Sequence, residues 1–160
     1  MGAVRIGIAA SDPDGVLAFP VQTLVRDPGA DQDPTPGERA RLAELIEQYA
    51  AIEVVVGLPR SLDGGEGPAA ARARRYARGI ATHIAPRPVR LVDERLTTVD
   101  AHRNLAASGV AGRAQRGLVD QAAAVLILQA ALEAERASGT PPGAPAIASG
   151  RKPRRKGTRT

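Results

Sequence analysis

Residues 52–92 read IEVVVGLPRSLDGGEGPAAARARRYARGIATHIAPRPVRLV, and this stretch decides the fold class. Its opening IEVVV is a short β-branched run, typical of a strand that is buried on both faces. A glycine-rich loop follows over 58–67, and Pro68 then leads into helix formers that continue to Ile84. VRLV at 89–92 is a second short strand. Strands that alternate with helices predict an α/β fold, with helices on the faces of a mixed sheet.

The segments on either side continue this pattern. Turn residues at 11–15 separate two apolar runs, which predicts a β-hairpin. Thr97 and Asp100 have the spacing of a capping box at a helix start. The elements expected besides the strands and helix above are a hairpin of 4–9 and 16–25, an amphipathic helix around Leu42–Tyr49, a helix from Thr97 and a last helix over about 115–136.

The amino-acid composition limits the classes of function that this chain can have. The chain has 160 residues, of which 43% are hydrophobic and 24% charged, as expected for one globular domain. Aromatic residues make up 2%, which excludes a surface built from rows of base-stacking rings. The absence of cysteine excludes disulfides, thiolate zinc sites and thiol nucleophiles, and it fits a reducing compartment.

The chain carries no obvious targeting or membrane signal. Its longest unbroken apolar stretch, 122–128, is far shorter than the ~20 residues that a membrane-spanning helix needs. The first ten residues lack the pattern of a signal peptide. We therefore expect a cytoplasmic protein that does not engage a membrane.

Positive charge is concentrated at the carboxyl end. The whole chain has a formal net charge of +5, yet residues 137–160 hold six cations and no acid. The start of this segment is rich in Ala, Pro, Gly and Ser, which cannot bury enough apolar surface to offset the entropy of ordering. We expect a folded domain over 1–136 and a disordered basic tail over 137–160. Such a tail favours contact with a polyanion, although many serve only solubility.

Two carboxylates are candidates for chemistry. Glu94 directly follows a strand, and the carboxyl ends of strands are where open α/β sheets bind ligands. The alternative is that Glu94 and its neighbour Asp93 are solvated acids that pair with Arg95. Asp120 heads the apolar side of the last helix, where a lone carboxylate needs a reason. Its alternative role is to complement the helix dipole, worth ~0.3–1 kcal/mol.

Carboxylates from two elements, without cysteine or a histidine pattern, would suit Mg²⁺ or Mn²⁺ and disfavour zinc. His83 and His102 stand on different expected helices and have no ligand spacing. The loop at 58–67 lacks the Lys-Ser/Thr pair of a P-loop, which disfavours nucleoside-triphosphate hydrolysis. Arg60 and Ser61 in this loop could hold a phosphate, and an ordinary surface turn explains them equally well.

The chain resembles the YqgF/RuvX family of pre-16S ribosomal RNA nucleases in four ordered segments over about 3–136: RIGIAASDPDG (5–15), VVVGLPRSLDGGEGPAA (54–70), VRLVDERLTT (89–98) and VDQAAAVLILQAAL (119–132). The resemblance implies an RNase H-like fold, similar to that of Holliday-junction resolvases. It also implies phosphodiester cleavage by acidic residues that hold divalent metal. Glu94 matches the acid of the family's DERxTT motif, and Asp120 matches the acid of its VDQxAA helix.

The same resemblance implies a mechanism. One metal ion activates water and a second stabilises the departing oxyanion. Arg60, Arg95 and Arg116 could brace phosphates, because a planar guanidinium engages two phosphate oxygens at once.

The amino terminus departs from the family pattern. Members usually begin with a strand like GIDVG, which carries a first catalytic aspartate, and Gly2 aligns with the last glycine of that motif. We expect that the true start lies upstream and that a GTG valine codon was read as Met1. Asp12 cannot replace the missing acid, since it lies at the far end of its strand. Without the central strand, the 160-residue chain should be poorly stable and inactive.

Three functions stay open at this point. The first is a metal-dependent endonuclease that processes the 5′ end of pre-16S ribosomal RNA during ribosome biogenesis, as a monomer or homodimer and in contact with ribosomal particles. The second is a nuclease acting on branched DNA, because the same fold and acids serve resolvases. The third is a non-catalytic factor that binds nucleic acid or the ribosome after losing one acid.

Overall fold

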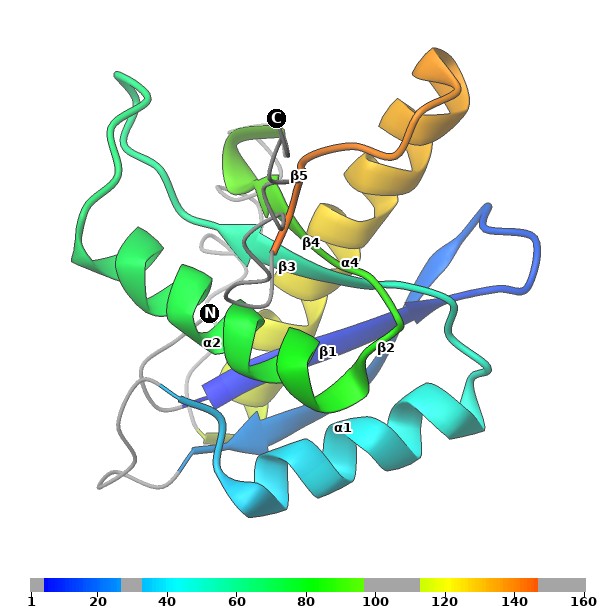
Figure 1. Cartoon of the computed structure of the whole chain (residues 1–160), viewed down its shortest axis with the longest axis vertical. Helices are drawn as coiled ribbons and strands as arrows, with labels where there is room; N and C mark the ends of the chain where they lie inside the picture. The colour runs from blue at the N-terminus through cyan, green and yellow to red at the C-terminus, as the bar shows by residue number, and fades with distance from the viewer. Residues whose placement is uncertain (1–4, 27–32, 97–112, 147–160) are drawn as a thin grey trace, which may run out of the picture.

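The structure is a computed structural model that describes residues 5–26, 33–96 and 113–146, with backbone alone for 96 and 113–116. Its elements confirm the α/β class (Figure 1). They are, in chain order, β1 (Arg5–Ser11), β2 (Ala18–Val25), α1 (Pro36–Gln48), β3 (Val54–Leu58), α2 (Pro68–Ile84), β4 (Val89–Asp93), the 3-10 turn η1 (Glu94–Leu96), α4 (Arg113–Ser138) and β5 (Ala144–Pro145).

The strands form two separate sheets rather than one. β1 and β2 are the expected hairpin, paired antiparallel from Arg5 opposite Val25 to Ser11 opposite Ala18. β3 and β4 pair parallel, and the short β5 adds antiparallel to β4. Among the described residues, no pairing joins β1 to β3. α1 and α2 lie in front of the strands and α4 lies behind them (Figure 1).

A capping box and a proline fix the start of α1. Thr35 is its N-cap, and the Thr35 hydroxyl accepts from the backbone N–H of Glu38 at 3.2 Å. Glu38 in return accepts from the N–H of Thr35 at 3.0 Å, which completes a capping box. Pro36 occupies the first turn, where a missing N–H costs nothing. The helix expected around Leu42–Tyr49 is confirmed, but it begins at Pro36, before the expected stretch, and ends at Gln48.

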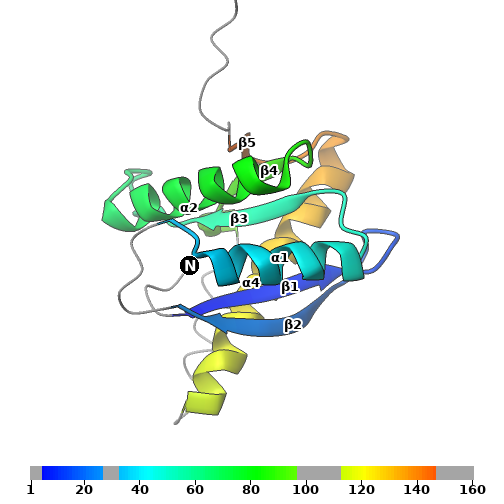
Figure 2. The same ribbon diagram turned by 60° about the horizontal axis from the view of Figure 1, so that its bottom comes forward.

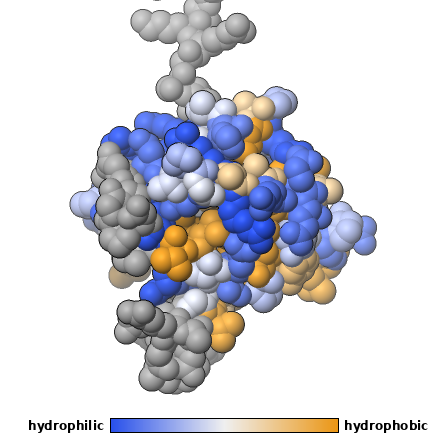
Figure 3. All heavy atoms as spheres, turned by 90° about the horizontal axis from the view of Figure 1, so that it is seen from below, coloured by the Kyte–Doolittle hydropathy of each residue, from blue (hydrophilic) through white to orange (hydrophobic). Residues whose placement is uncertain are grey.

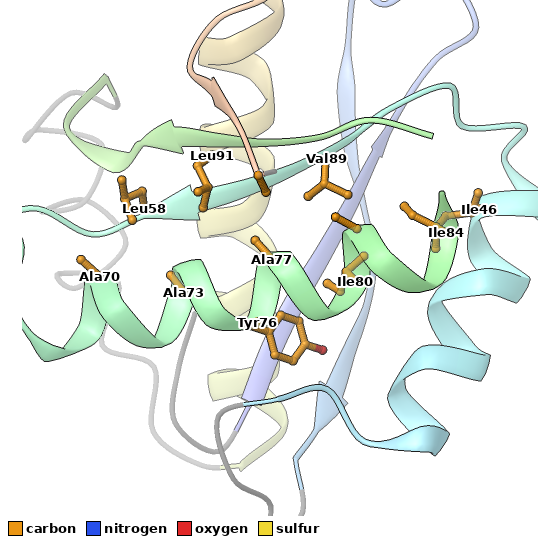
Figure 4. Packing of buried hydrophobic residues seen from close by; sticks show 12 residues of the cluster. Ile46, Leu58, Ala70, Ala73, Tyr76, Ala77, Ile80, Ile84, Val89 and Leu91 are labelled. Carbon is orange, nitrogen blue, oxygen red and sulfur yellow. The ribbon is translucent and has the colours of Figure 1, made fainter. Parts of the chain in front are cut away.

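α2 packs closely on β3 and β4 because its inner face is made of small residues. Ala70, Ala73 and Ala77 are fully buried and face the strands (Figure 4). Alanine brings the helix axis near the sheet, so the β-branched side chains of the parallel pair are covered on this face.

A buried ion pair joins the end of β2 to both front helices. The Arg26 Nε donates to Glu38 Oε1 at 3.0 Å, and both side chains are almost fully buried. The Arg26 guanidinium also lies 5.0 Å from the ring centroid of Tyr76. Burial raises the pKa of Tyr76 far above its usual value, and the negative charge of Glu38 adds to this shift. The cluster ties the hairpin to α1 and α2.

α4 is the long apolar helix expected at 115–136, extended at both ends. Its part from Gly117 to Ser138 is long and apolar enough to cross a membrane by length and composition alone. The helix is instead attached to the hairpin: Thr23 Oγ1 donates to the Gly117 carbonyl at 2.8 Å, and Gln129 Oε1 accepts from the Ala18 N–H at 2.9 Å. Core helices of soluble proteins pass the same test of length and composition, and 6% of the most apolar part of this helix is buried.

The segment after residue 136 is partly structured, which differs from the mobile tail expected from 137 onward. α4 continues to Ser138, and Ala144–Pro145 pairs with β4. Ala146 is 8% exposed and belongs to the core. Packing against β4 supplies an ordering energy that composition does not reveal. The remainder of the tail, 147–160, lies outside the described residues, as does 97–112 with the expected helix start at Thr97.

Candidate functional site

A cavity of about 1100 Å³ lies between the two sheets. All of β1 and Val54–Gly57 of β3 line it, on opposite sides. Residues of α4, α1 and α2 also line it. Figure 2 shows β3 above β1, with α1 in front of them. Both candidate carboxylates, Glu94 and Asp120, line this cavity.

Glu94 is positioned by the end of β4. The strand stops at Asp93, and the chain turns through η1, so Glu94 stands at the carboxyl edge of the parallel pair. Its carboxylate lies over Gly57 of β3: a Cβ built on Gly57 would be 2.8 Å from Glu94 Oε1 and 2.9 Å from Ile127 Cδ1. A Cβ at position 57 would displace the ends of these two side chains, so glycine leaves the space into which the Glu94 carboxylate reaches.

Asp120 is positioned by a close contact between α4 and β1. A Cβ on Gly7 would lie 2.8 Å from the Gln121 nitrogen and closer still to the Asp120 carbonyl, so only glycine fits. Asp120 itself is half-buried, and its Oδ2 accepts from Arg5 Nε at 2.7 Å. The resulting ion pair stands at the start of β1 and compensates the charge of a carboxylate on an apolar helix.

These residues fit a hard divalent cation. Mg²⁺ keeps several waters and is usually held by one or two carboxylates together with substrate phosphates, which is what Glu94 and Asp120 can offer. Within the described part of the chain, no group of three or more acidic, histidine or cysteine residues gathers in a metal-binding arrangement. His83 is exposed, and His102 lies outside the described residues. Asp120 would have to loosen its bond to Arg5 to bind an ion.

Two of the three arginines expected at phosphates are paired with acids. Arg95 binds Asp93 through Nε at 3.0 Å and Nη2 at 2.7 Å, which holds the pKa of Asp93 below its usual value. Arg60 Nη2 donates to Glu66 Oε1 at 3.2 Å. Glu66 also accepts from Arg74 Nε at 2.8 Å, and this bond lowers the pKa of Glu66. The side chain of the third arginine, Arg116, is outside the described residues.

Releasing these arginines should strengthen contact with nucleic acid. We expect Glu66→Gln to tighten RNA binding and to steepen the dependence of log K on log salt by about one unit or more, because Arg60 and Arg74 each become free to neutralise a phosphate. Filter binding across a salt series measures the slope. Glu44→Gln is the matched control, since it removes the same charge from the exposed Arg41 pair. Equal slopes for both variants would mean that the 58–67 loop does not contact the RNA.

Sequence reasoning missed three residues at this site. Arg5 is a lone cation in the apolar run of β1, and Asp120 is a lone acid in the apolar α4. These opposite charges on two apolar elements are a signal from which their ion pair could have been predicted. Gly7 and Gly57 each sit inside an apolar strand run, a pattern that often marks a close approach of another backbone. The sequence does not show which atoms of the folded chain lie against each glycine.

Comparison with known proteins extends this description. The family model described as "RuvX: Holliday junction resolvase" matches residues 1–134. A relative from Streptomyces coelicolor is 59% identical over 143 residues, which cover 89% of this chain and 82% of the relative. One from Streptomyces avermitilis is 57% identical over 143 residues, 89% of this chain and 88% of that protein. One from Kineococcus radiotolerans is 54% identical over 156 residues, which cover 98% of this chain and 79% of that protein.

All three relatives bear the name "Putative pre-16S rRNA nuclease". The matches include the strand, loop and helix segments that place Glu94 and Asp120 at one cavity. The family is RNase H-like in fold, and the mixed α/β arrangement seen here agrees with it. By the extent of the family match and the identity to its relatives, this chain belongs to the RuvX family.

Proposed function

We propose that this protein is a cytoplasmic endonuclease that processes the 5′ end of pre-16S ribosomal RNA during ribosome biogenesis. The observation that carries the proposal is the placement of Glu94 and Asp120, which come from different elements and line the one cavity between the two sheets. The names of the relatives support RNA as the substrate.

In this proposal Glu94 and Asp120 hold Mg²⁺ or Mn²⁺, which when bound activates water and stabilises the departing oxyanion. Arg5 keeps Asp120 in place and compensates its charge until an ion takes over that role. Arg60, Arg95 and Arg116 contact substrate phosphates, the first two after exchanging their carboxylate partners for phosphate oxygens. The basic segment 147–160 adds sequence-independent attraction to RNA.

A second candidate is a nuclease for branched DNA, favoured by the description of the family model as a Holliday junction resolvase. A third is a non-catalytic factor that binds nucleic acid or ribosomal particles. Its support is that the described residues form no group of three or more possible metal ligands, and that Asp120 is engaged by Arg5.

One cleavage experiment separates the three. A labelled pre-16S leader RNA and a labelled four-way DNA junction are incubated with the chain, with and without the residues encoded in frame upstream of Met1, in Mg²⁺, Mn²⁺ or EDTA. We expect cleavage of the RNA alone, in metal alone, by the extended chain. Cutting of the junction alone would identify a resolvase. Binding of RNA without any cutting, under every metal condition, would identify the non-catalytic factor.

A further inference from the structure

The 58–67 loop carries the most exposed large apolar side chain in the part of the chain that the structure describes. Leu62 on this loop is 92% exposed. Figure 1 shows that the loop, which joins β3 to α2, projects beyond the layers of the fold, whereas apolar surface on the face in Figure 3 lies in patches among hydrophilic side chains. A single exposed leucine is common on protein surfaces. What sets Leu62 apart is the turn that holds it and the arginine beside that turn.

A tight turn holds Leu62 at the tip of the loop. The Gly64 N–H donates to the Ser61 carbonyl at 2.8 Å, and Leu62 occupies the corner between them. The N–H and the hydroxyl of Ser61 both donate to the Gly65 carbonyl at 3.0 Å. The Ser61 hydroxyl and the Gly65 N–H also donate to the Asp63 carboxylate, and these bonds hold the pKa of Asp63 below its usual value. Because the turn is fixed before any ligand arrives, little conformational entropy is lost when Leu62 binds one.

The turn lies against the arginine that follows Glu94. A Cβ built on Gly64 would be 3.6 Å from Arg95 Nη1 and 3.9 Å from Arg95 Nη2, so the guanidinium lies beside this glycine. Two residues of chain span at most ~7 Å, which limits the distance from the backbone of Gly64 to that of Leu62. Because stacked nucleotides follow one another at ~3.4 Å along a strand, Leu62 is within about three nucleotides of a phosphate held by Arg95.

The loop leaves the fold at the edge where Glu94 stands. Leu58, the last residue of β3, pairs with Asp93, the last residue of β4, and the next residue along the chain is Glu94. Neighbouring parallel strands thus deliver the loop and the candidate acid at their carboxyl ends, where open α/β sheets bind ligands. A nucleic acid strand with a phosphate at Glu94 and Arg95 therefore runs past the 58–67 loop.

No aromatic ring lies on this loop to contact a base. The chain has two tyrosines and one phenylalanine, and the structure describes all of them. Tyr76 is buried in the core, and Phe19 packs on Tyr49 with ring centroids 5.8 Å apart. Proteins that open stacked bases without rings insert aliphatic side chains such as leucine, isoleucine or methionine. Leu62 is a side chain of this type, rigidly presented beside a cation.

We propose that Leu62 is a wedge that enters a stacked base step of the RNA, within about three nucleotides of the phosphate that Arg95 contacts. A step opens most easily beside a bulge, a mismatch or the end of a duplex, so the wedge favours RNA in which single strand meets duplex. RNA fits this tip better than an apolar protein surface does, because the Arg95 guanidinium can exchange Asp93 for a phosphate. The proposal rests on the nuclease function proposed above and adds a determinant of where the protein binds.

The first test measures binding of the leader RNA in EDTA, with Tm as the check that each variant folds. Leu62→Ala should weaken binding about tenfold, because burial of a leucine side chain is lost. The slope of log K against log salt should stay unchanged, because no phosphate contact is removed. Leu62→Met should keep the parent affinity, because it keeps the apolar volume.

Leu17→Ala is the matched control. Leu17 is also an exposed leucine in a turn, between β1 and β2, and Figures 1 and 2 show this turn and the 58–67 loop on opposite sides of the molecule. It should bind RNA as the parent does. A loss of affinity as large for Leu17→Ala as for Leu62→Ala would mean that exposed leucines act non-specifically, which overturns the proposal.

A fluorescent adenine analogue, whose emission rises when the base unstacks, shows whether a step opens. It is placed at successive positions of an RNA hairpin with a single-stranded tail. The parent chain and Leu62→Met should raise the emission at one step near the end of the duplex, and Leu62→Ala should not. A parent chain that opens no step overturns the proposal, as does a Leu62→Ala chain that opens the same step or binds as tightly as the parent. Cleavage of the leader RNA is measured separately, so the wedge can fail while the proposed function holds.

Discussion

Replacing Glu94 by Gln, or Asp120 by Asn, is expected to lower kcat/KM for cleavage of the leader RNA by at least about 100-fold. Each substitution keeps the side-chain shape and removes the negative charge that would hold a divalent ion in the proposed site. The two carboxylates line one cavity, so either loss should disable the same site. Single-turnover cleavage with the extended chain, over a range of Mg²⁺ concentrations, measures the effect.

The control for this pair is Glu47→Gln, which removes a carboxylate from the exposed pair with Arg87, away from the cavity. It should cleave at the parent rate. Titration of Mn²⁺ followed by its paramagnetic resonance signal gives a readout that does not need substrate, and both site variants should bind the ion more weakly. If both retain parent cleavage and parent Mn²⁺ affinity, the assignment of the site is wrong.

The second large effect concerns the contact that seats Asp120. Gly7→Ala is expected to destabilise the protein by about 4 kcal/mol or more, because the new Cβ would overlap the Asp120 carbonyl and lie 2.8 Å from the Gln121 nitrogen. Neither atom belongs to a flexible side chain, so α4 as a whole must move away from β1. Total stabilities of domains are about 5–15 kcal/mol, so much of the folded population would be lost.

Gly37→Ala provides the comparison, since a Cβ at that position has no neighbour within 4 Å. Gly37 lies in the first turn of α1, where alanine should stabilise the helix by up to about 1 kcal/mol. Urea unfolding of the two variants beside the parent chain gives the difference. A cost below about 1 kcal/mol for Gly7→Ala would mean that α4 does not approach β1 this closely.

The elements that local chemistry determines were predicted well. The hairpin follows from turn residues between two apolar runs, and the start of α2 follows from Pro68. α4 was expected from its helix formers, although its ends extend two residues further on each side. The strand at Ala144–Pro145 was not predicted, because it forms only where β4 offers an edge to pair with. No periodicity announces a two-residue strand.

Among the site residues, Glu94 and Asp120 stood out in the sequence because each is an acid next to an apolar element. Their placement at one cavity stays invisible in the sequence, since they are 26 positions apart and reach the cavity only through the packing of α4 against η1 and β3. The roles of the arginines depended even more on packing. The pairing of Asp93 with Arg95 was an alternative that the sequence already offered, whereas Glu66 as the partner of Arg60 emerged only with the loop conformation.

The sequence by itself determined the α/β class, the strand and helix segments that decide it, and the two acids, because these depend on neighbours within one or two turns of chain. Tertiary structure alone decided that the strands split into two sheets, that a cavity lies between them, and that Arg5 meets Asp120. Contacts between residues more than a hundred positions apart depend on the packing of whole elements, and that packing is settled only when all of them compete for the same core.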